Sequence, residues 1–190
     1  MFLSRKNQTK NNSSIIGKNA CLSTYSEVFM VVSVLGCGRW GSFISWYLAG
    51  SGHSVTEWGR AEGKAFNELK ENGRNEYVEL DERINLTSDL EYAVKNSEAI
   101  VISIKSQSLR EFAREIATYG AKDKKIILCM KGLEENTGKR LTEIMIEEGY
   151  DKNKTAVWVG PGHIQEFTRG KPNCMVIDGY NAELVRELAD

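Results

Sequence analysis

The stretch Val31-Val32-Ser33-Val34-Leu35-Gly36-Cys37-Gly38-Arg39-Trp40-Gly41 decides the fold. A short apolar, β-branched run ends in glycines spaced G-x-G-x-x-G, and a helical pattern follows. Gly36 permits a tight turn off the strand, Gly38 lets the backbone approach a pyrophosphate, and Gly41 lets the helix pack closely on the strand. The unpaired N–H groups at the helix start suit an anion without a lysine. The stretch therefore predicts the first strand, turn and helix of a dinucleotide-binding βαβ unit.

Composition narrows the class of protein. The 190 residues are 41% hydrophobic and carry 25 basic against 26 acidic side chains, for a net charge of −1. This balance gives no basic field for nucleic acid, and no apolar run is long enough to span a bilayer. The four cysteines form no C-x-x-C pair and show no metal-ligand spacing with the two histidines. We expect one globular, cytoplasmic domain with reduced thiols, no metal and a small-molecule partner.

The chain divides near the first strand. Residues 1–29 are rich in Ser, Asn and Lys and have no acidic residue before Glu27, which predicts a disordered leader. An organelle transit peptide is one interpretation of this basic segment, and a dispensable extension is the other. Residues 30–190 are expected to form the dinucleotide-binding domain.

The remainder alternates between strand and helix patterns. Strands are predicted at 54–58, 84–87, 99–104, 125–130, 155–159 and 174–177, and helices at about 40–49, 62–70, 88–95, 108 onward, 137–148 and 163–169. Two of these helices have an apparent capping box, Ser88 with Glu91 and Ser108 with Glu111. Such alternation predicts an α/β fold, a Rossmann-like, doubly wound, mostly parallel sheet with helices on both faces.

The residues after the second strand bear on cofactor choice. An acidic residue there normally accepts the adenosine ribose hydroxyls, whereas a nearby arginine can hold a 2′-phosphate. The chain has Gly59 and Arg60 at this point. This favours NADP over NAD, with an ordinary solvated arginine as the alternative.

Two further strand ends carry candidate ligand-binding residues. Lys131-Gly132 follows the strand at 125–130, and Gly160-Pro161-Gly162-His163 follows the strand at 155–159. Open α/β sheets bind ligands at the carboxyl ends of their strands. A lysine ammonium group there can hold a phosphate or a polarised oxygen, although a strand can equally end in a surface lysine.

An ordered set of motifs carries a family resemblance. The set comprises Gly36-Cys37-Gly38-Arg39-Trp40-Gly41, Gly52-His53-x-Val55 with Trp58-Gly59-Arg60, Arg74-Asn75-x-x-Tyr77, Thr87-x-Asp89-Leu90, Lys131-Gly132-Leu133 and Gly160-Pro161-x-x-x-x-Glu166-x-x-x-Gly170-x-Pro172. From Met30 to about Asp178 the chain resembles the N-terminal domain of NAD(P)-dependent glycerol-3-phosphate dehydrogenases. The resemblance implies reversible hydride transfer between a nicotinamide cofactor, NAD or NADP, and dihydroxyacetone phosphate or sn-glycerol 3-phosphate.

The resemblance also implies roles for individual residues. The implied cofactor contacts, besides the three glycines, are Arg39, Trp40, Arg60, Tyr77, Lys131 and Ile164, and the implied substrate contacts are Lys131, Gly160 and Gly162. Four positions depart from the family pattern. Gly162 replaces a hydroxyl residue, His163 an aromatic, Ile164 an alanine and Lys105 a proline. These departures affect the expected substrate geometry more than the expected cofactor binding.

In this family a second, helical domain carries the lysine that acts as general acid/base. The resemblance places that domain beyond Asp190, so no catalytic residue is assigned within the chain, and the chain alone is expected to turn over substrate at a negligible rate. A homodimer is one expectation for the full-length enzyme. Two alternatives stay open, a dinucleotide-binding module without catalysis and a related oxidoreductase of the ketopantoate-reductase type.

Overall fold

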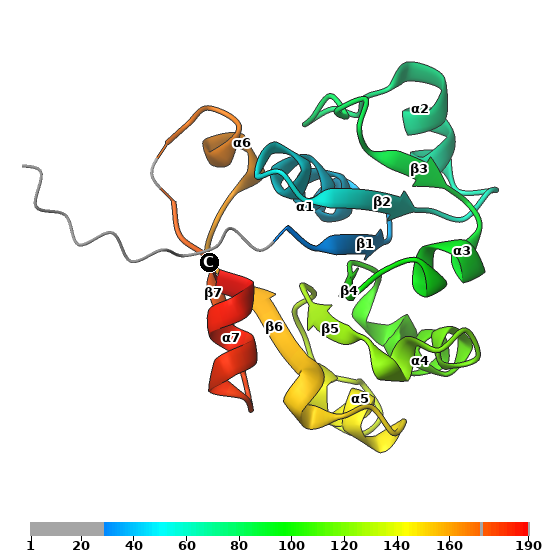
Figure 1. Cartoon of the computed structure of the whole chain (residues 1–190), viewed down its shortest axis with the longest axis vertical. Helices are drawn as coiled ribbons and strands as arrows, with labels where there is room; N and C mark the ends of the chain where they lie inside the picture. Colours follow the sequence, from blue (N-terminus) through cyan, green and yellow to red (C-terminus); the bar gives the residue numbers. More distant parts are fainter. Residues whose placement is uncertain (1–28, 172, 190) are drawn as a thin grey trace, which may run out of the picture.

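The computed structural model describes residues 29–171 and 173–189, so the predicted leader lies outside the described residues except for Phe29. The β-branched runs form one seven-stranded sheet with the order β3-β2-β1-β4-β5-β6-β7 (Figure 1). Its strands are β1 (Val31–Leu35), β2 (Ser54–Trp58), β3 (Asn85–Thr87), β4 (Ala99–Ile102), β5 (Lys125–Leu128), β6 (Thr155–Val159) and β7 (Val176–Gly179). All neighbours pair in parallel except β6 with β7. The predicted α/β, Rossmann-like class is confirmed.

Helices connect the strands and cover both faces of the sheet. The α-helices are α1 (Arg39–Gly50), α2 (Lys64–Asn72), α3 (Leu90–Lys95), α4 (Leu109–Ala117), α5 (Leu141–Glu147), α6 (Ile164–Phe167) and α7 (Ala182–Ala189). Short 3₁₀ turns lie at η1 (Ser106–Ser108), η2 (Ala121–Asp123) and η3 (Lys152–Lys154). In Figure 1, α6 and α7 lie to the left of the strands, α1 lies above β1, and α3, α4 and α5 lie on the right and lower right of the sheet.

Each face of the sheet has its own apolar core. Leu35, Ile100 and Ile102 pack with side chains of α3, α4 and α5. Val34 and Val101 pack on the other face with side chains of α1 and α6. Adjacent residues of one strand thus enter opposite cores, as in a parallel sheet that is covered on both faces. This explains why the central strands are continuous apolar runs rather than alternating ones.

Three helix starts differ from the sequence-based expectation. Asp89, rather than Ser88, caps α3, and its Oδ1 accepts a hydrogen bond from Tyr92 N at 2.9 Å. Ser108 has helical backbone angles as the last residue of η1, so its side chain makes no cap bond. Helix α5 starts at Leu141 instead of 137, because Glu134 N and Lys139 O close a turn at 2.9 Å in that segment. Both predicted capping boxes are therefore wrong.

The last part of the chain also differs in detail. The final strand is β7 (Val176–Gly179), two residues later than predicted, and it runs antiparallel to β6. Helix α7 (Ala182–Ala189) was not predicted from the sequence. The central strands β4 and β5 end at Ile102 and Leu128, two residues earlier than expected. These changes lie at element ends and leave the strand order that positions the site intact.

The turn between β1 and α1 depends on two glycines. Gly36 has φ +117°, and a Cβ atom there would lie 2.2 Å from Ser103 O. A Cβ atom at Gly41 would lie 1.6 Å from Gly36 O. Backbone therefore occupies the space that any side chain at position 41 would need. Gly38 differs, since a Cβ atom there would meet nothing within 4 Å.

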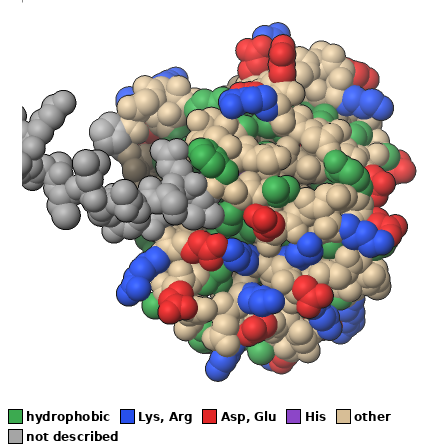
Figure 2. All heavy atoms as spheres, in the orientation of Figure 1, with side chains coloured by type: hydrophobic (Ala, Val, Ile, Leu, Met, Phe, Trp, Pro, Cys, Tyr) green, Lys and Arg blue, Asp and Glu red, His purple; other side chains and the backbone are tan. Residues whose placement is uncertain are grey.

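The surface is mixed in charge. On the face in Figure 2, acidic and basic side chains are interspersed rather than gathered by sign. No described helix is both long enough and apolar enough to cross a membrane. Residues 29–171 and 173–189 contain no group of three or more His, Cys, Asp or Glu side chains placed to hold a metal ion.

The close approach of α1 to the glycine turn predicts the effect of one methyl group. Gly41→Ala should lower the free energy of unfolding by about 2–4 kcal/mol, because the new Cβ must push Gly36 O away. Urea denaturation of the 190-residue chain measures this loss. Gly50→Ala at the other end of α1 is the matched control, since its Cβ would meet nothing within 4 Å. Equal stability of the two variants would contradict the proposed steric constraint.

Candidate functional site

The candidate site lies where the strand order reverses. Strand β1 pairs with β2 on one side and with β4 on the other, so the chain leaves the sheet in opposite directions from this point. The turn after β1 is fixed to both neighbours, because Gly36 N donates to Trp58 O at 2.9 Å and Ser103 N donates to Leu35 O at 2.9 Å. Doubly wound sheets bind dinucleotides in the crevice at this switch point.

The N-terminus of α1 faces this crevice without a side-chain cap. Gly38 is the N-cap residue, makes no side-chain cap bond, and is followed by a first turn without an acidic residue. Gly38 is exposed, and the absence of neighbours around its Cβ position leaves open space above the turn. The free N–H groups and the helix dipole therefore present a positive end to that space. This arrangement fits a pyrophosphate, the anion that the glycine spacing predicts.

Arg39 and Tyr77 meet at the rim of the turn. The Arg39 guanidinium carbon lies 4.4 Å from the centroid of the Tyr77 ring, a cation–π contact. Arg39 Nη2 also donates to Gln165 Oε1 at 3.1 Å. Two of the predicted cofactor contacts are thus neighbours, although they lie far apart in sequence.

A cavity of ≈ 280 Å³ opens between α1 and the ends of β4, β5 and β6. It brings together Trp40, Lys131 and Gly160, three of the predicted site residues. Ser106 also lines it, from the loop Lys105-Ser106-Gln107 that the end of a central strand places on the ligand side of the sheet. The rest of its wall comes from residues outside the predicted contacts, namely Ile44, Ser103, Ile104, Cys129, Met130, Trp158, Val159 and Met175. Only their position in the sequence could have indicated that these residues line a site, since most lie within three residues of a strand end. A mostly apolar pocket with few polar groups is typical of a small-molecule site.

Other predicted site residues lie outside this cavity. Arg60 is exposed just beyond the end of β2. Gly162 is buried, and a Cβ atom there would lie 2.5 Å from the Phe167 ring. The Ile164 side chain is 1% exposed and belongs to the core on the α1 side of the sheet. The structure therefore gives Ile164 a packing role, and its side chain offers no free surface for a cofactor.

One unpredicted residue, Glu57, lies beneath the glycine turn. Its side chain is fully buried in β2, and Oε1 accepts a hydrogen bond from Ser42 Oγ at 2.8 Å. The same hydroxyl lies 3.2 Å from Cys37 O, so Ser42 links the carboxyl group to the turn. Within the described residues, Glu57 Oε2 has no hydrogen-bond partner. The sequence signal was an acidic residue inside an otherwise buried strand.

Burial controls the protonation of this region. It raises the pKa of Glu57 to about 7, while the Ser42 hydroxyl acts in the opposite direction. Burial, together with the nearby Glu57 carboxylate, raises the pKa of the Cys37 thiol to about 11. A thiol that stays protonated is a poor nucleophile and metal ligand. Cys37 therefore acts as a small packing residue of the turn.

Comparison with known proteins agrees with this geometry. A profile of the family described as NAD-dependent glycerol-3-phosphate dehydrogenase N-terminus matches residues 31–185. The chain belongs to this family. Glycerol-3-phosphate dehydrogenase (NAD(P)+) of Thermoanaerobacter sp. is 34% identical over 164 residues, which are 85% of this chain and 49% of that enzyme. The enzyme of the same name from Moorella thermoacetica is 35% identical over 84% of this chain and 48% of its own length. The chain thus spans about half the length of these relatives.

Solved structures show the same domain fold. Glycerol-3-phosphate dehydrogenase from Coxiella burnetii matches with a TM-score of 0.73 at 22% identity, over 84% of this chain and 50% of that protein. The Saccharomyces cerevisiae enzyme matches with a TM-score of 0.67 at 19% identity, over 80% of this chain and 48% of its own. A UDP-glucose dehydrogenase from Pyrobaculum islandicum also matches, with a TM-score of 0.61 at 17% identity over 88% of this chain and 45% of that protein. At these identities the likeness shows the fold alone, whereas the family profile distinguishes this glycerol-3-phosphate dehydrogenase domain within it.

The buried Glu57 gives this domain a pH-dependent stability. The carboxyl group has its ordinary pKa of 4.5 in the unfolded chain and a pKa of about 7 in the folded chain. Between these values the folded state holds the extra proton, so stability falls as pH rises. Glu57→Gln removes this loss, which amounts to about 3 kcal/mol at most. Thermal unfolding from about pH 5 to about pH 8 should show a flatter profile for the variant than for the wild type.

The control for this measurement is Glu68→Gln, which changes an exposed glutamate of α2. Its stability should follow the wild-type dependence on pH. Parallel profiles for the wild type and Glu57→Gln would show that Glu57 does not titrate in this range.

Proposed function

We propose that this chain binds NAD(H) or NADP(H) at the Gly36–Gly41 turn and serves as the cofactor-binding domain of a glycerol-3-phosphate dehydrogenase. The observation that carries the proposal is the open space at Gly38 above the uncapped start of α1. Backbone fills the Cβ positions of Gly36 and Gly41, whereas nothing in the chain fills that of Gly38. A pyrophosphate that approaches this point meets N–H groups and no side chain.

The cofactor would extend from this point in two directions. Its adenosine half would lie toward the end of β2, where Arg60 supplies a cation for a 2′-phosphate and Glu57 is too deeply buried to accept ribose hydroxyls. Its nicotinamide half would lie toward the ≈ 280 Å³ cavity beside Trp40. When bound, the nicotinamide supplies or accepts the hydride. The chain's own residues bind the cofactor and exclude water from the apolar part of the cavity wall.

Lys131 is the proposed contact for the phosphate or a polarised oxygen of dihydroxyacetone phosphate or sn-glycerol 3-phosphate. Among the described residues that line the cavity, Lys131 is the one with a cationic side chain. The lining contains one other titratable group, the Cys129 thiol. Burial raises the pKa of the Cys129 thiol to about 11, so it is a poor proton donor at neutral pH. We therefore assign no general acid/base to residues 29–171 and 173–189. The substrate-binding roles of Gly160 and Gly162 remain predictions of the same proposal.

A second candidate function is a dinucleotide-binding domain without turnover. It is favoured by the same cavity, whose described lining holds a cation but no acid/base pair. The family match supports a glycerol-3-phosphate dehydrogenase over the ketopantoate-reductase alternative. A location in the cytoplasm also remains a prediction.

Cofactor binding can be tested with one methyl group at the open position. Gly38→Ala should fold normally, because Gly38 has φ −77° and its Cβ would meet no protein atom within 4 Å. The methyl group would instead occupy the space of the pyrophosphate, so affinity for NADH or NADPH should fall by at least about tenfold. Isothermal titration calorimetry measures the affinity, and Gly50→Ala is the matched control in the same helix. Unchanged binding by Gly38→Ala, or a folded wild type that binds neither cofactor, would refute the proposal.

Cofactor preference provides a separate prediction for Arg60. Arg60→Ala should weaken NADPH binding by about tenfold and leave NADH binding near the wild-type level, because only NADPH has the 2′-phosphate. The readout is the ratio of the two dissociation constants. Arg74→Ala removes another exposed arginine and is the control. An unchanged ratio in Arg60→Ala would make Arg60 an ordinary surface charge.

A further inference from the structure

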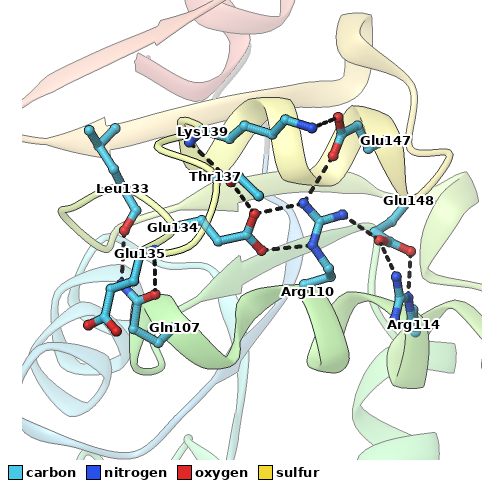
Figure 3. Close-up of polar contacts among 10 residues, drawn as sticks. All are labelled: Gln107, Arg110, Arg114, Leu133, Glu134, Glu135, Thr137, Lys139, Glu147 and Glu148. Atoms are coloured by element: carbon cyan, nitrogen blue, oxygen red, sulfur yellow. Dashed lines mark hydrogen bonds and ion pairs between the residues drawn. The ribbon is translucent and has the colours of Figure 1, made fainter.

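The turn that carries Lys131 is anchored by groups outside the cavity (Figure 3). After Lys131 and Gly132, Leu133 forms an isolated antiparallel bridge with Arg140, and Glu134 N donates to Lys139 O at 2.9 Å. Gly132 has φ +121°, so the backbone at this point has the freedom of glycine. Cys129 N donates to Ile102 O at 3.2 Å, so Lys131 lies between a segment held by the sheet and a turn held by other groups.

Arg110, in the first turn of α4, makes several charge-assisted contacts with these segments. Its Nε donates to Glu134 Oε1 at 2.7 Å and its Nη2 donates to Glu134 Oε2 at 2.9 Å, a bidentate pair. Its Nη1 donates to Glu148 Oε1 at 2.7 Å, directly after α5. All three guanidinium nitrogens are thus used, and the Arg110 and Glu134 side chains are only 23% and 15% exposed. The fork joins α4, the end of α5 and the turn after β5.

Gln107 anchors the backbone on both sides of Glu134. Its Nε2 donates to Leu133 O at 2.8 Å, and its Oε1 accepts from Glu135 N at 3.0 Å. Figure 3 shows this amide and the Arg110 fork reaching the same turn from one side, that of η1 and α4. Side chains from the segment after β4 therefore hold the segment after β5, Gln107 through main-chain atoms of that segment and Arg110 through the Glu134 side chain.

We propose that Arg110 is a positioning residue, which through Glu134 holds the Lys131–Gly132 turn so that the Lys131 ammonium group faces the ligand crevice. The inference rests on the role proposed above for Lys131. Arg110 does not line the cavity and acts only through the turn. Gln107 supports the same geometry through the backbone.

The charge state of the anchor suits this role. Hydrogen bonds from Arg110, and then from Thr137, hold the pKa of Glu134 at about 2. Hydrogen bonds from Arg114, and then from Arg110, hold the pKa of Glu148 at about 2. The carboxylates therefore stay ionised throughout the neutral range and keep their charge-assisted bonds. A lysine in place of Arg110 would keep the charge but lose the planar fork.

The first arm of the test measures the turn directly in the 190-residue chain. Arg110→Met should increase amide hydrogen exchange at residues 131–139 by at least about tenfold, because it frees Glu134 from α4 and α5. Arg114→Met is the matched control. Arg114 makes a bidentate pair with the same Glu148, at 2.8 and 2.9 Å, and has no hydrogen bond to the turn. Its exchange at these residues should equal that of the wild type.

The second arm measures ligand affinity by titrating NADPH, and then dihydroxyacetone phosphate into the NADPH-saturated chain. Lys131→Ala should lower the affinity for at least one of these ligands by about tenfold. Arg110→Met should lower the affinity for the same ligand by about three- to tenfold. In the Lys131→Ala background, Arg110→Met should cause no further loss. A role in general stability would lower affinity equally in both backgrounds. Arg114→Met should bind like the wild type.

Gln107→Ala provides a second route to the same result if Arg110→Met does not fold. Gln107 is exposed, and its removal leaves no partly buried charge without a partner. In Gln107→Ala, amide hydrogen exchange should rise at residues 133–135. If every folded variant exchanges like the wild type, the anchoring of this turn by Arg110 and Gln107 would be refuted. If Lys131→Ala binds a ligand weakly but Arg110→Met, despite faster exchange at the turn, binds that ligand like the wild type, the positioning role of Arg110 would be refuted.

Failure of the proposed function gives a different pattern. If Lys131→Ala binds both ligands like the wild type, the role of Lys131 is wrong and the positioning role falls with it, although faster exchange would still report the anchor. If the folded wild type binds neither ligand, the proposed function itself is refuted.

Discussion

The contact between Gly36 O and the Cα region of Gly41 is the constraint on which the rest of the structure depends. It lets α1 begin directly against the end of β1, so that the exposed helix start faces the open crevice at the strand ends. The third partner is Ser103, whose carbonyl oxygen occupies the Cβ position of Gly36. Three backbone segments thus meet without any side chain between them. The direction in which α1 leaves β1 and the open space at Gly38 depend on this close approach.

The sequence predicted the parts of the fold that local patterns encode. Central parallel strands are buried on both faces, so β4 and β5 appeared as continuous β-branched runs. Helix starts were predicted less well, because they depend on backbone angles that the sequence does not state. Ser108 shows this, since its helical conformation as part of η1 prevents it from acting as a cap. The start of α5 depended on the turn that Glu134 N and Lys139 O close, and on the cap that Glu143 Oε2 gives Arg140 N at 2.8 Å.

The candidate site could be predicted from the sequence to a similar extent. The glycine turn and the strand ends at Lys131 and Gly160 could be proposed as site residues, because glycine spacing and strand position can be recognised in the sequence, and the structure places Lys131 and Gly160 at one cavity. Glu57 and the Arg110 contacts were not found, because both depend on partners from other elements. The burial of Ile164 was equally invisible, since an apolar residue after a loop can face either a ligand or the core. Non-local contacts, rather than weak motifs, limited the prediction.

The anchoring contacts also divide the crevice mechanically. On the β4–β5 side, side chains of η1 and α4 connect two successive loops, so that these loops form a single stiff wall. On the β6 side, the described side-chain bonds of residues 160–175 are local, such as Asn173 to Glu166, apart from the exposed contact between Arg39 and Gln165. The β6 loop is held instead by apolar packing, since Ile164 is buried and the Phe167 ring centroid lies 5.1 Å from that of Phe43 in α1. One side of the crevice is thus joined by directional polar bonds between loops, and the other by apolar contact with a helix.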